Sequence, residues 1–201
     1  YTEKKSPTKD GVIPRNFSSK TLNYYHYRSF MIKYGKNSFM KGIFPWFSNW
    51  FFNFVGASVI EKGSTFEETV SSDRNIHVKR NVYLGVNSAL AAHLVDGIFG
   101  NISYFKVTVG DNCTLSGFNI IASGCELKDN SYLFPMAAAT KHNTTKGNNY
   151  YYGMPLRRIF TKKTMEYLKI SEEDLKRAED LRTKQESEKL ERIKKEENKK
   201  E

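Results

Sequence analysis

Several side chains of this sequence could do chemistry, and two of them stand close together. His93 and Asp96 lie three residues apart, and a carboxylate beside an imidazole can orient it for proton transfer. Basic side chains further along the chain could pair with phosphate groups through charge-assisted hydrogen bonds, or they could be ordinary surface charge. The candidates for that second role are Lys141, Arg157 and Arg158.

A six-residue repeat provides the elements that must position these side chains. Every sixth residue between Val109 and Ala139 is aliphatic, and the residue four places after each is small or short and polar. This period fits neither an amphipathic helix nor an alternating strand, but it is typical of a parallel β-helix with about eighteen residues per triangular coil. The aliphatic positions are Val109, Leu115, Ile121, Leu127, Leu133 and Ala139, and the small positions are Cys113, Asn119, Cys125, Ser131 and Ala137.

A shorter run with the same period lies upstream at Val78, Leu84 and Leu90. The two runs are out of phase, because the count breaks after Leu90 and resumes only at Val109. An insertion that breaks the register of a solenoid usually leaves it as a loop, and such loops often carry function. The sequence therefore predicts a loop over residues 97–106, and His93 lies in the last hexad before this break.

The charge of the chain favours an anionic partner without specifying it. The sequence has 32 Lys and Arg against 22 Asp and Glu, giving a net charge of +10 over 201 residues. Such an excess suits a phosphate-bearing cofactor, a membrane surface or nucleic acid, or it serves solubility alone. Because the sequence contains no recognised nucleic-acid-binding module, we expect no nucleic-acid partner.

The cysteines indicate a reducing environment. Cys113 and Cys125 occupy small-residue positions of the repeat, so we expect buried thiols, and neither a disulfide nor a metal pair. No signal-peptide pattern is seen. We expect the chain to be intracellular or to lie at a membrane surface.

The segments on either side of the repeat differ from it in composition. Residues 1–54 form a basic, aromatic arm, whose first fifteen residues we expect to be poorly ordered. Within residues 39–55 we expect a helix from Pro45 to Phe54, with Phe44, Phe47, Phe51 and Phe54 on one face; it either caps the β-helix or lies in a membrane interface. The β-helix should occupy residues 55–160. The many Lys and Glu residues of 161–201 predict a solvated, charged α-helix there.

The repeat, the turn Gly153-Met154-Pro155-Leu156 and the following helix together resemble the hexapeptide-repeat acyltransferases, a superfamily of left-handed parallel β-helices. The resemblance covers about residues 50 to 160. Three shorter blocks are similar to the acyltransferase-like C-terminal region of polylysine-synthetase-type peptide synthetases. These blocks are residues 54–59, 92–97 and 106–112.

This resemblance implies a fold and an activity. The fold is an all-β solenoid, a left-handed parallel β-helix with an aromatic N-terminal capping segment and a charged C-terminal helix. The activity is transfer of an acyl group from coenzyme A (acetyl-CoA) or a carrier thioester to a hydroxyl or amine. His93 would be the general base and Asp96 its partner, in a homotrimer with sites between neighbouring prisms. Lys141, Arg157 and Arg158 would meet the phosphates of coenzyme A.

Two other interpretations remain open. Zinc-dependent carbonic anhydrases share this fold, and His77, His93 and His142 could supply three ligands, but their spacing differs from that family, so we expect no metal. The chain could also be a non-catalytic scaffold or assembly subunit of a larger, membrane-associated complex. In that case the aromatic segment and the charged tail would make the contacts.

Overall fold

The computed structural model describes residues 2–40, 42–43, 46–54, 58–67 and 74–159, together with residues 173, 176, 177, 180, 184 and 187. Contacts divide the chain into two units, Tyr1–Ile159 and Phe160–Glu201. The six described positions of the second unit are helical. Most of the charged helix that the sequence predicts for residues 161–201 lies outside the described residues.

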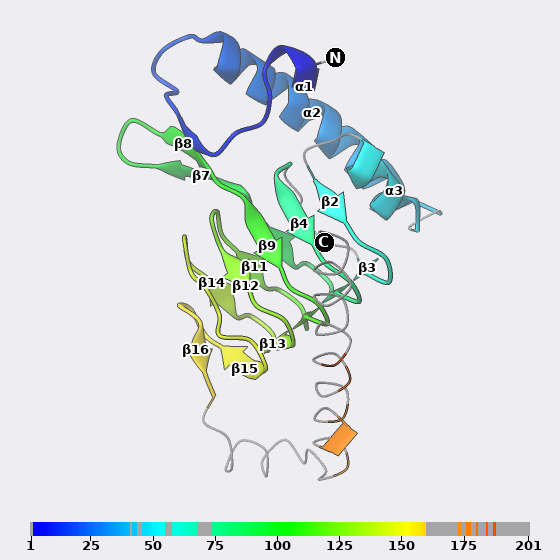
Figure 1. Ribbon diagram of the computed structural model, residues 1–201. Coiled ribbons are helices and arrows are strands. Elements are labelled where there is room, and N and C mark those ends of the chain that lie inside the picture. The colour runs from blue at the N-terminus through cyan, green and yellow to red at the C-terminus, as the bar shows by residue number, and fades with distance from the viewer. Residues whose placement is uncertain are drawn as a thin grey trace, which may run out of the picture. The chain divides into compact units, whose positions relative to one another are not determined.

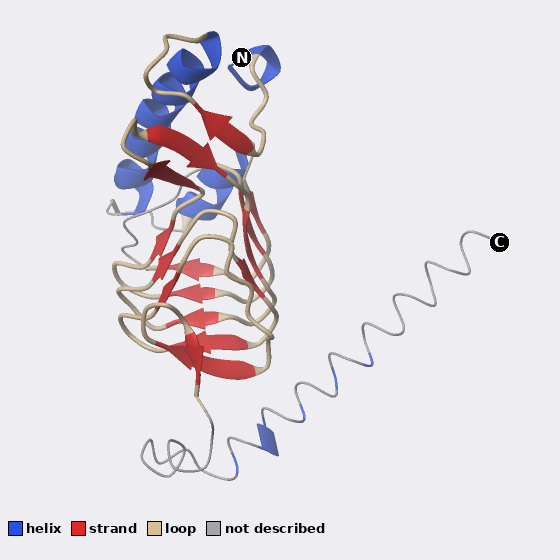
Figure 2. Ribbon diagram, turned by 90° about the vertical axis from the view of Figure 1, so that its left-hand side faces the viewer, coloured by secondary structure: helices blue, strands red, loops and turns tan. Residues whose placement is uncertain are grey.

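Residues 58–67 and 74–159 wind into a three-sided parallel β-helix (Figures 1 and 2). Each face is a ladder of short strands, and in the regular coils the chain visits the first, second and third faces in turn. The first face holds β2 (Val59–Ile60), β4 (Ile76–Val78), β9 (Val107–Val109) and β12 (Glu126–Leu127). The second holds β3 (Thr65–Phe66), β5 (Tyr83–Leu84), β10 (Thr114–Leu115), β13 (Ser131–Leu133), β15 (Asn149–Tyr152) and β16 (Arg157–Arg158), and the third β6 (Ala89–Leu90), β11 (Ile120–Ile121) and β14 (Ala138–Ala139).

The aliphatic side chains of the repeat fill the inside of this prism, as predicted. The six aliphatic stops between Val109 and Ala139 are at most 1% exposed, and the five small positions that alternate with them are equally buried. The thiols of Cys113 and Cys125 are free and buried, also as predicted. Burial raises the pKa of the Cys113 thiol to about 12. Because like residues of the repeat stack on one another along the axis, they form one continuous apolar core.

The strand register gives the length of each coil. Thr114 pairs with Tyr132, eighteen residues on, and Val59 pairs with His77 at the same separation. One coil is longer, since Tyr83 pairs with Thr114 at a separation of 31 residues. The difference, 31 minus 18, is an insertion of 13 residues. It falls in the coil where the sequence predicted a loop.

The corner from the first face to the second is held by a column of asparagines. Residues at this corner have a left-handed backbone, with φ of 55° at Asn81 and 54° at Asn112, a conformation that asparagine tolerates better than most side chains. Their amides donate along the axis, from Asn81 to Asn112 (3.3 Å), from Asn112 to Asn130 (3.1 Å) and from Asn130 to Asn148 (2.6 Å). We call Asn81, Asn112, Asn130 and Asn148 the asparagine ladder.

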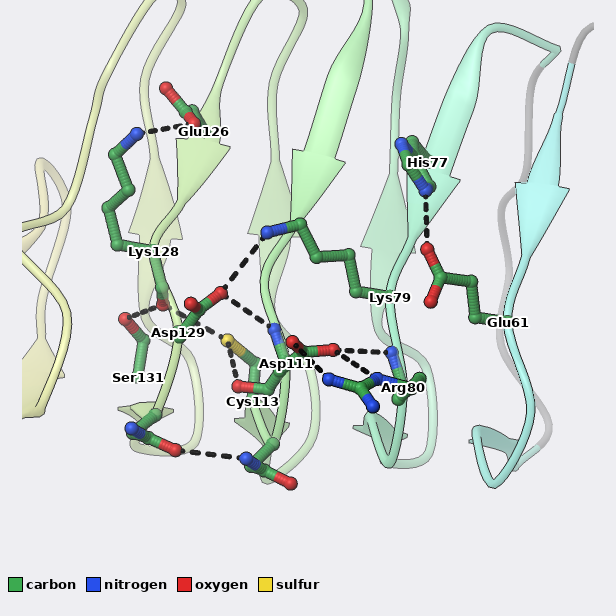
Figure 3. Close-up of polar contacts among 12 residues, drawn as sticks. Glu61, His77, Lys79, Arg80, Asp111, Cys113, Glu126, Lys128, Asp129 and Ser131 are labelled. Carbon is green, nitrogen blue, oxygen red and sulfur yellow. Dashed lines mark hydrogen bonds and ion pairs between the residues drawn. The ribbon is translucent and has the colours of Figure 1, made fainter. Parts of the chain in front are cut away.

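Charged side chains run beside the asparagine ladder (Figure 3). The Arg80 guanidinium donates to both carboxylate oxygens of Asp111, at 3.3 and 3.2 Å. The Asp111 backbone N–H donates to the Asp129 carboxylate at 2.9 Å, and Lys79 approaches that carboxylate at 3.4 Å. This corner therefore repeats both its backbone shape and its side-chain hydrogen bonds from coil to coil.

The N-terminal segment lies beside the prism and is ordered further than predicted. It contains α1 (Thr2–Lys5), β1 (Gly11–Ile13) and α2 (Lys20–Met40). The prediction that the first fifteen residues are poorly ordered is wrong for β1, because β1 pairs antiparallel with β8 (Asn101–Tyr104), with Val12 opposite Ser103. A partner strand far along the sequence leaves no local signal.

The aromatic segment forms α3 (Phe47–Phe54), which contacts the first coil. Asn53 accepts from the Ile60 backbone N–H at 2.8 Å and donates to its carbonyl at 2.9 Å. Phe52 is buried, with its ring centroid 5.9 Å from that of Phe66. The predicted face is wrong: Ser48 and Phe52 are buried, whereas Phe47 and Phe54 are exposed. Phe44 and Pro45 lie outside the described residues.

Candidate functional site

The 13-residue insertion is a β-hairpin at the corner where the third face leads into the first. It consists of β7 (His93–Asp96) and β8, paired antiparallel, with β1 as a third strand. The coil closes beneath it, because the Phe105 backbone N–H donates to the Ala92 carbonyl at 2.9 Å. The Ser123 hydroxyl of the next coil donates to that carbonyl at 2.8 Å. The hairpin is therefore anchored rigidly at its base.

His93 lies on one face of the hairpin, beside α2. It is directly opposite Tyr104 in the strand pair, so both side chains project from the same face. The Tyr25 ring of α2 meets His93 edge to face at 5.5 Å and Tyr104 at 6.0 Å between centroids. The half-buried imidazole of His93 thus belongs to an aromatic cluster that joins the hairpin to α2.

Asp96 lies on the other face of the hairpin. Strand residues three apart project to opposite sides, and Ser103, diagonally across the pair, shares the face of Asp96. The Asp96 carboxylate accepts from the Lys141 ammonium at 2.6 Å and from the Ser103 hydroxyl. The structure therefore brings together Asp96 and Lys141, which the sequence analysis assigned to different roles. Ser103 was missed, because its place became visible only with the hairpin register.

The partners of Asp96 determine its ionisation. The hydrogen bond from Lys141, followed by that from Ser103, holds the pKa of the Asp96 carboxyl below its usual value. The positive charge of Lys141 and the nearby His142 act in the same direction. At neutral pH Asp96 is therefore a carboxylate within a partly exposed ion pair.

Lys141 and His142 form the rest of this corner, two coils further along the prism. His142 is exposed, and its ring meets that of Phe105 edge to face at 4.8 Å between centroids. The Lys141 ammonium lies 5.5 Å from the centroid of the same Phe105 ring, within the range of a cation–π contact. Gly124 leaves room for His142, since a Cβ there would come within 2.3 Å of the imidazole Nδ1. We call Asp96, Ser103, Phe105, Lys141 and His142 the hairpin corner.

The two arginines lie elsewhere. Arg157 and Arg158 form β16, which pairs antiparallel with β15 at the end of the second face, and both are exposed. Lys141, by contrast, follows β14 of the third face. The predicted phosphate-binding residues therefore fall on different parts of the last coil.

The remaining histidine of the sequence analysis is part of the first face. His77 in β4 contacts the Glu61 carboxylate at 2.9 Å (Figure 3). Its strand neighbour in the next coil is Thr108, so His77 and His93 do not stack. Among the described residues no cluster of three or more His, Cys, Asp or Glu side chains is arranged to hold a metal ion.

The hairpin corner, together with the opposite face of the hairpin that carries His93, can support proton transfer. Two imidazoles, His93 and His142, flank the hairpin root, one half-buried and one exposed. An imidazole of this kind can accept a proton from an acceptor hydroxyl or amine. His142 was missed as a candidate base, although its place eighteen residues after Gly124 could have been read from the repeat.

Comparisons with known proteins give the fold. No protein-family model matches the sequence, and no curated protein sequence matches it significantly. Among solved structures, a hexapeptide-repeat acetyltransferase of Vibrio cholerae, complexed with acetyl coenzyme A, matches with a TM-score of 0.58 and 10% identity, over 72% of this chain and 92% of that chain. A galactoside acetyltransferase in complex with coenzyme A matches with a TM-score of 0.54 and 18% identity, over 78% and 90%.

A third match is shorter. The maltose O-acetyltransferase of Clostridium difficile 630 has 22% identity and a TM-score of 0.36, and the alignment spans 51% of this chain and 58% of that chain. At 10% and 18%, the identities of the two longer matches are those of a shared fold. This chain therefore has the left-handed parallel β-helix fold of the hexapeptide-repeat acetyltransferases.

Proposed function

We propose that this protein is an acyltransferase that moves an acyl group from coenzyme A, or from a carrier thioester, to a hydroxyl or amine. Two similar folds have acetyl coenzyme A or coenzyme A bound. The observation that carries the proposal is the inserted hairpin, whose root holds a half-buried histidine on one face and an ion-paired carboxylate on the other.

In the proposed reaction His93 is the general base. It takes the proton of the acceptor hydroxyl or amine while the nucleophile attacks the thioester carbonyl. A tetrahedral intermediate forms, its oxyanion stabilised by nearby N–H donors. The intermediate collapses by breaking the carbon–sulfur bond, and the departing thiolate receives the proton from His93. The acyl group ends on the acceptor, and coenzyme A leaves as its free thiol.

Asp96 acts as a positioning residue in this proposal. It lies on the other face of the hairpin from His93 and is held by Lys141 and Ser103. Its ion pair ties the hairpin to the last coil, 45 residues away in sequence. We propose that this tie keeps His93 in place against Tyr25.

The proposed coenzyme A contacts are Arg157, Arg158 and Lys141. Exposed guanidinium groups suit phosphate recognition, because their planar donors match phosphate oxygens. Lys141 would have to share its ammonium between Asp96 and a phosphate. The variant Arg157→Gln/Arg158→Gln should therefore raise KM for acetyl-CoA with little change in kcat, measured as thiol release at varied acetyl-CoA.

The assignment of the base is tested by a matched pair of variants. His93→Ala should lower acyl transfer at least about a hundredfold, the usual scale of a lost general base. His142→Ala should retain most of it. The assay is release of free coenzyme A from acetyl-CoA with a panel of hydroxyl and amine acceptors. Loss in His142→Ala alone would move the base to His142, and unchanged rates in both would end the proposal.

Binding of the co-substrate separates an enzyme from a scaffold. A ligand at 100 times its dissociation constant raises the free energy of unfolding by about 2.7 kcal/mol. Acetyl-CoA at millimolar concentration should therefore raise the melting temperature of the wild-type protein. No shift would favour the scaffold alternative.

The tip of the hairpin supports assembly into a homotrimer. Ile98 is 94% exposed, and Phe99 and Val95 are also exposed. Such apolar side chains at a loop tip suit burial against a neighbouring copy. We propose a trimer with hairpins between prisms. Sedimentation equilibrium should give three chains, and Ile98→Ser/Phe99→Ser should give one.

A second candidate function has its own observation, an aromatic face on α3. Trp50 and Phe54 stack at 5.0 Å, and Trp46, Trp50 and Phe54 are more than half exposed. Exposed tryptophan and phenylalanine on a positively charged protein suit the surface of an anionic membrane. No helix among the described residues has the length and apolar character needed to cross a bilayer. We propose that residues 39–55 dock the protein peripherally as part of a larger assembly.

Vesicle sedimentation tests this docking. The wild-type protein should sediment with phosphatidylserine-containing vesicles and less with neutral ones. Trp46→Ser/Trp50→Ser should lower the bound fraction several-fold. The matched control is Phe118→Ser, an exposed aromatic at another corner of the prism. Equal binding by the two variants would remove α3 as the docking face.

A further inference from the structure

A cavity lies between the N-terminal arm, α2 and the hairpin, away from the hairpin corner. Its volume is about 430 Å³, within the range of pockets that bind small molecules. One wall is the arm from Lys5 to Ile13, and another is the face of α2 from Thr21 to Lys33. Arg74, before β4, and Tyr104 of β8 complete it.

The side chains around this cavity are mostly cationic. Five basic residues and one acidic residue, Asp10, line it. An oxygen of the Asp10 carboxylate already accepts from the Asn75 amide at 2.7 Å and from the Lys106 backbone N–H at 2.9 Å. The cavity therefore has an excess of positive charge. The basic residues are Lys5, Lys9, Arg28, Lys33 and Arg74.

Two of the five cations are buried. Arg28 is 9% and Arg74 6% exposed. Arg28 donates to the Thr8 hydroxyl at 3.3 Å and to the Ser6 carbonyl, and so ties the arm to α2. Since charges act more strongly where water is excluded, these guanidinium groups can hold an anion far better than exposed lysines can.

The rest of the lining is apolar or aromatic. Ile32 is buried, and Tyr25 and Tyr104 meet edge to face at 6.0 Å between centroids. Small-molecule sites combine such walls with a few placed polar groups. A ligand here would place an anionic group toward the arginines and a carbon skeleton toward the tyrosines.

We propose that this cavity binds a small molecule bearing a phosphate group. Arginine donors match phosphate oxygens in pairs, and a phosphate dianion suits a site lined by several cations. The site does not depend on acyl transfer and would exist in a scaffold as well. Because Tyr25 contacts both the cavity and His93, its occupant would also lie close to the proposed base.

The probe is phenyl phosphate, which carries a phosphate on an aromatic ring, titrated into the full chain by isothermal calorimetry at low salt. The wild-type protein should bind it with one site, and phenol should not bind. Arg74→Lys keeps the charge but removes the paired donors, so it should weaken binding at least about tenfold. Circular dichroism checks the fold of this buried variant.

Two variants of exposed lysines keep the test valid if Arg74→Lys does not fold. Lys33 lines the cavity and is exposed, whereas Lys62 is exposed in the turn after β2 and does not line it. Lys33→Gln should weaken binding about threefold, the scale of one partly screened charge, and Lys62→Gln should leave it unchanged. Absence of binding by the wild type, or equal weakening in both lysine variants, would overturn the proposal.

Discussion

Two corners of the same prism are built in opposite ways. At the corner from the first face to the second, four successive coils carry a left-handed asparagine, the first three of these amides donate to the asparagine of the next coil, and Arg80 pairs with Asp111 alongside (Figure 3). At the corner from the third face to the first, the same backbone position is taken by Asn75, Gly124 and His142, and one coil has a hairpin there instead. One corner repeats a structure, and the other varies it.

The difference separates the regular part of the prism from the candidate site. In the asparagine ladder the polar groups bond mainly to their counterparts in neighbouring coils. At the hairpin corner the polar groups come from distant parts of the chain, such as Asp96 and Lys141, and His142 is exposed. A corner without a repeating ladder can accept an insertion, because no column of side-chain bonds is broken by it.

The largest expected effect comes from removing the hairpin. Deleting residues 93–105 takes out 13 residues and joins Ala92 to Lys106. It should restore an eighteen-residue coil, because the coils after the insertion already have that spacing, as in the pairing of Thr114 with Tyr132. The prism should still fold, shown by a cooperative melt and a strand-type circular dichroism spectrum. Acyl transfer should disappear. A variant that retains transfer, or that does not fold, would contradict the separation of the two corners.

The next largest effect should come from a substitution in the apolar core of the prism, which both corners share. Leu115 is fully buried in the regular stack, so Leu115→Ala should lower the free energy of unfolding by about 2–5 kcal/mol. Val95 on the hairpin is mostly exposed, so Val95→Ala should change the free energy of unfolding by less than about 0.5 kcal/mol. Urea denaturation of both variants measures the difference. Similar losses would mean that the hairpin belongs to the core.

The regular part of the molecule was predictable from the sequence because its cause is local and repeated. Each inward residue from Val109 to Leu133 is buried, since the same side-chain position recurs at every turn of the chain. The 18-residue coil and the existence of an insertion after Leu90 followed from the same count. These features need no knowledge of distant contacts.

The candidate site was less predictable because it depends on distant pairings. Asp96 contacts Ser103 because of the hairpin register, and it contacts Lys141 because the coils stack. That β1 pairs with β8 has no periodic signal at all. The buried face of α3 was missed because Asn53, with its two hydrogen bonds to Ile60, helps to set the rotation of that helix.

A smaller effect should come from the asparagine ladder itself. Asn112→Ala removes two side-chain hydrogen bonds and places alanine at a φ of 54°, which should cost about 1–3 kcal/mol in the free energy of unfolding. Asn112→Gly restores the backbone freedom and isolates the amide contribution. At the hairpin corner His142→Asn should be nearly neutral, because asparagine also tolerates the left-handed backbone there. An equal cost at both corners would mean that the ladder adds nothing.

The smallest expected effect is a difference between the two corners in how the stability of the protein depends on pH. Burial alone would raise the pKa of Asp111, but hydrogen bonds from the Arg80 side chain and backbone outweigh it and lower the pKa. The Lys141 and Ser103 hydrogen bonds also lower that of Asp96. A lowered carboxyl pKa adds stability above the unfolded value of about 4, and this stability is lost as pH falls through the folded value. The Asp96 side chain is 42% exposed and that of Asp111 22%, so solvent screens the Asp96 interactions more. Asp111→Asn should therefore flatten the fall in melting temperature between pH 5 and pH 3 (roughly the range in which aspartates titrate) more than Asp96→Asn does. The reverse order would indicate that the hairpin corner, and not the ladder corner, supports the prism.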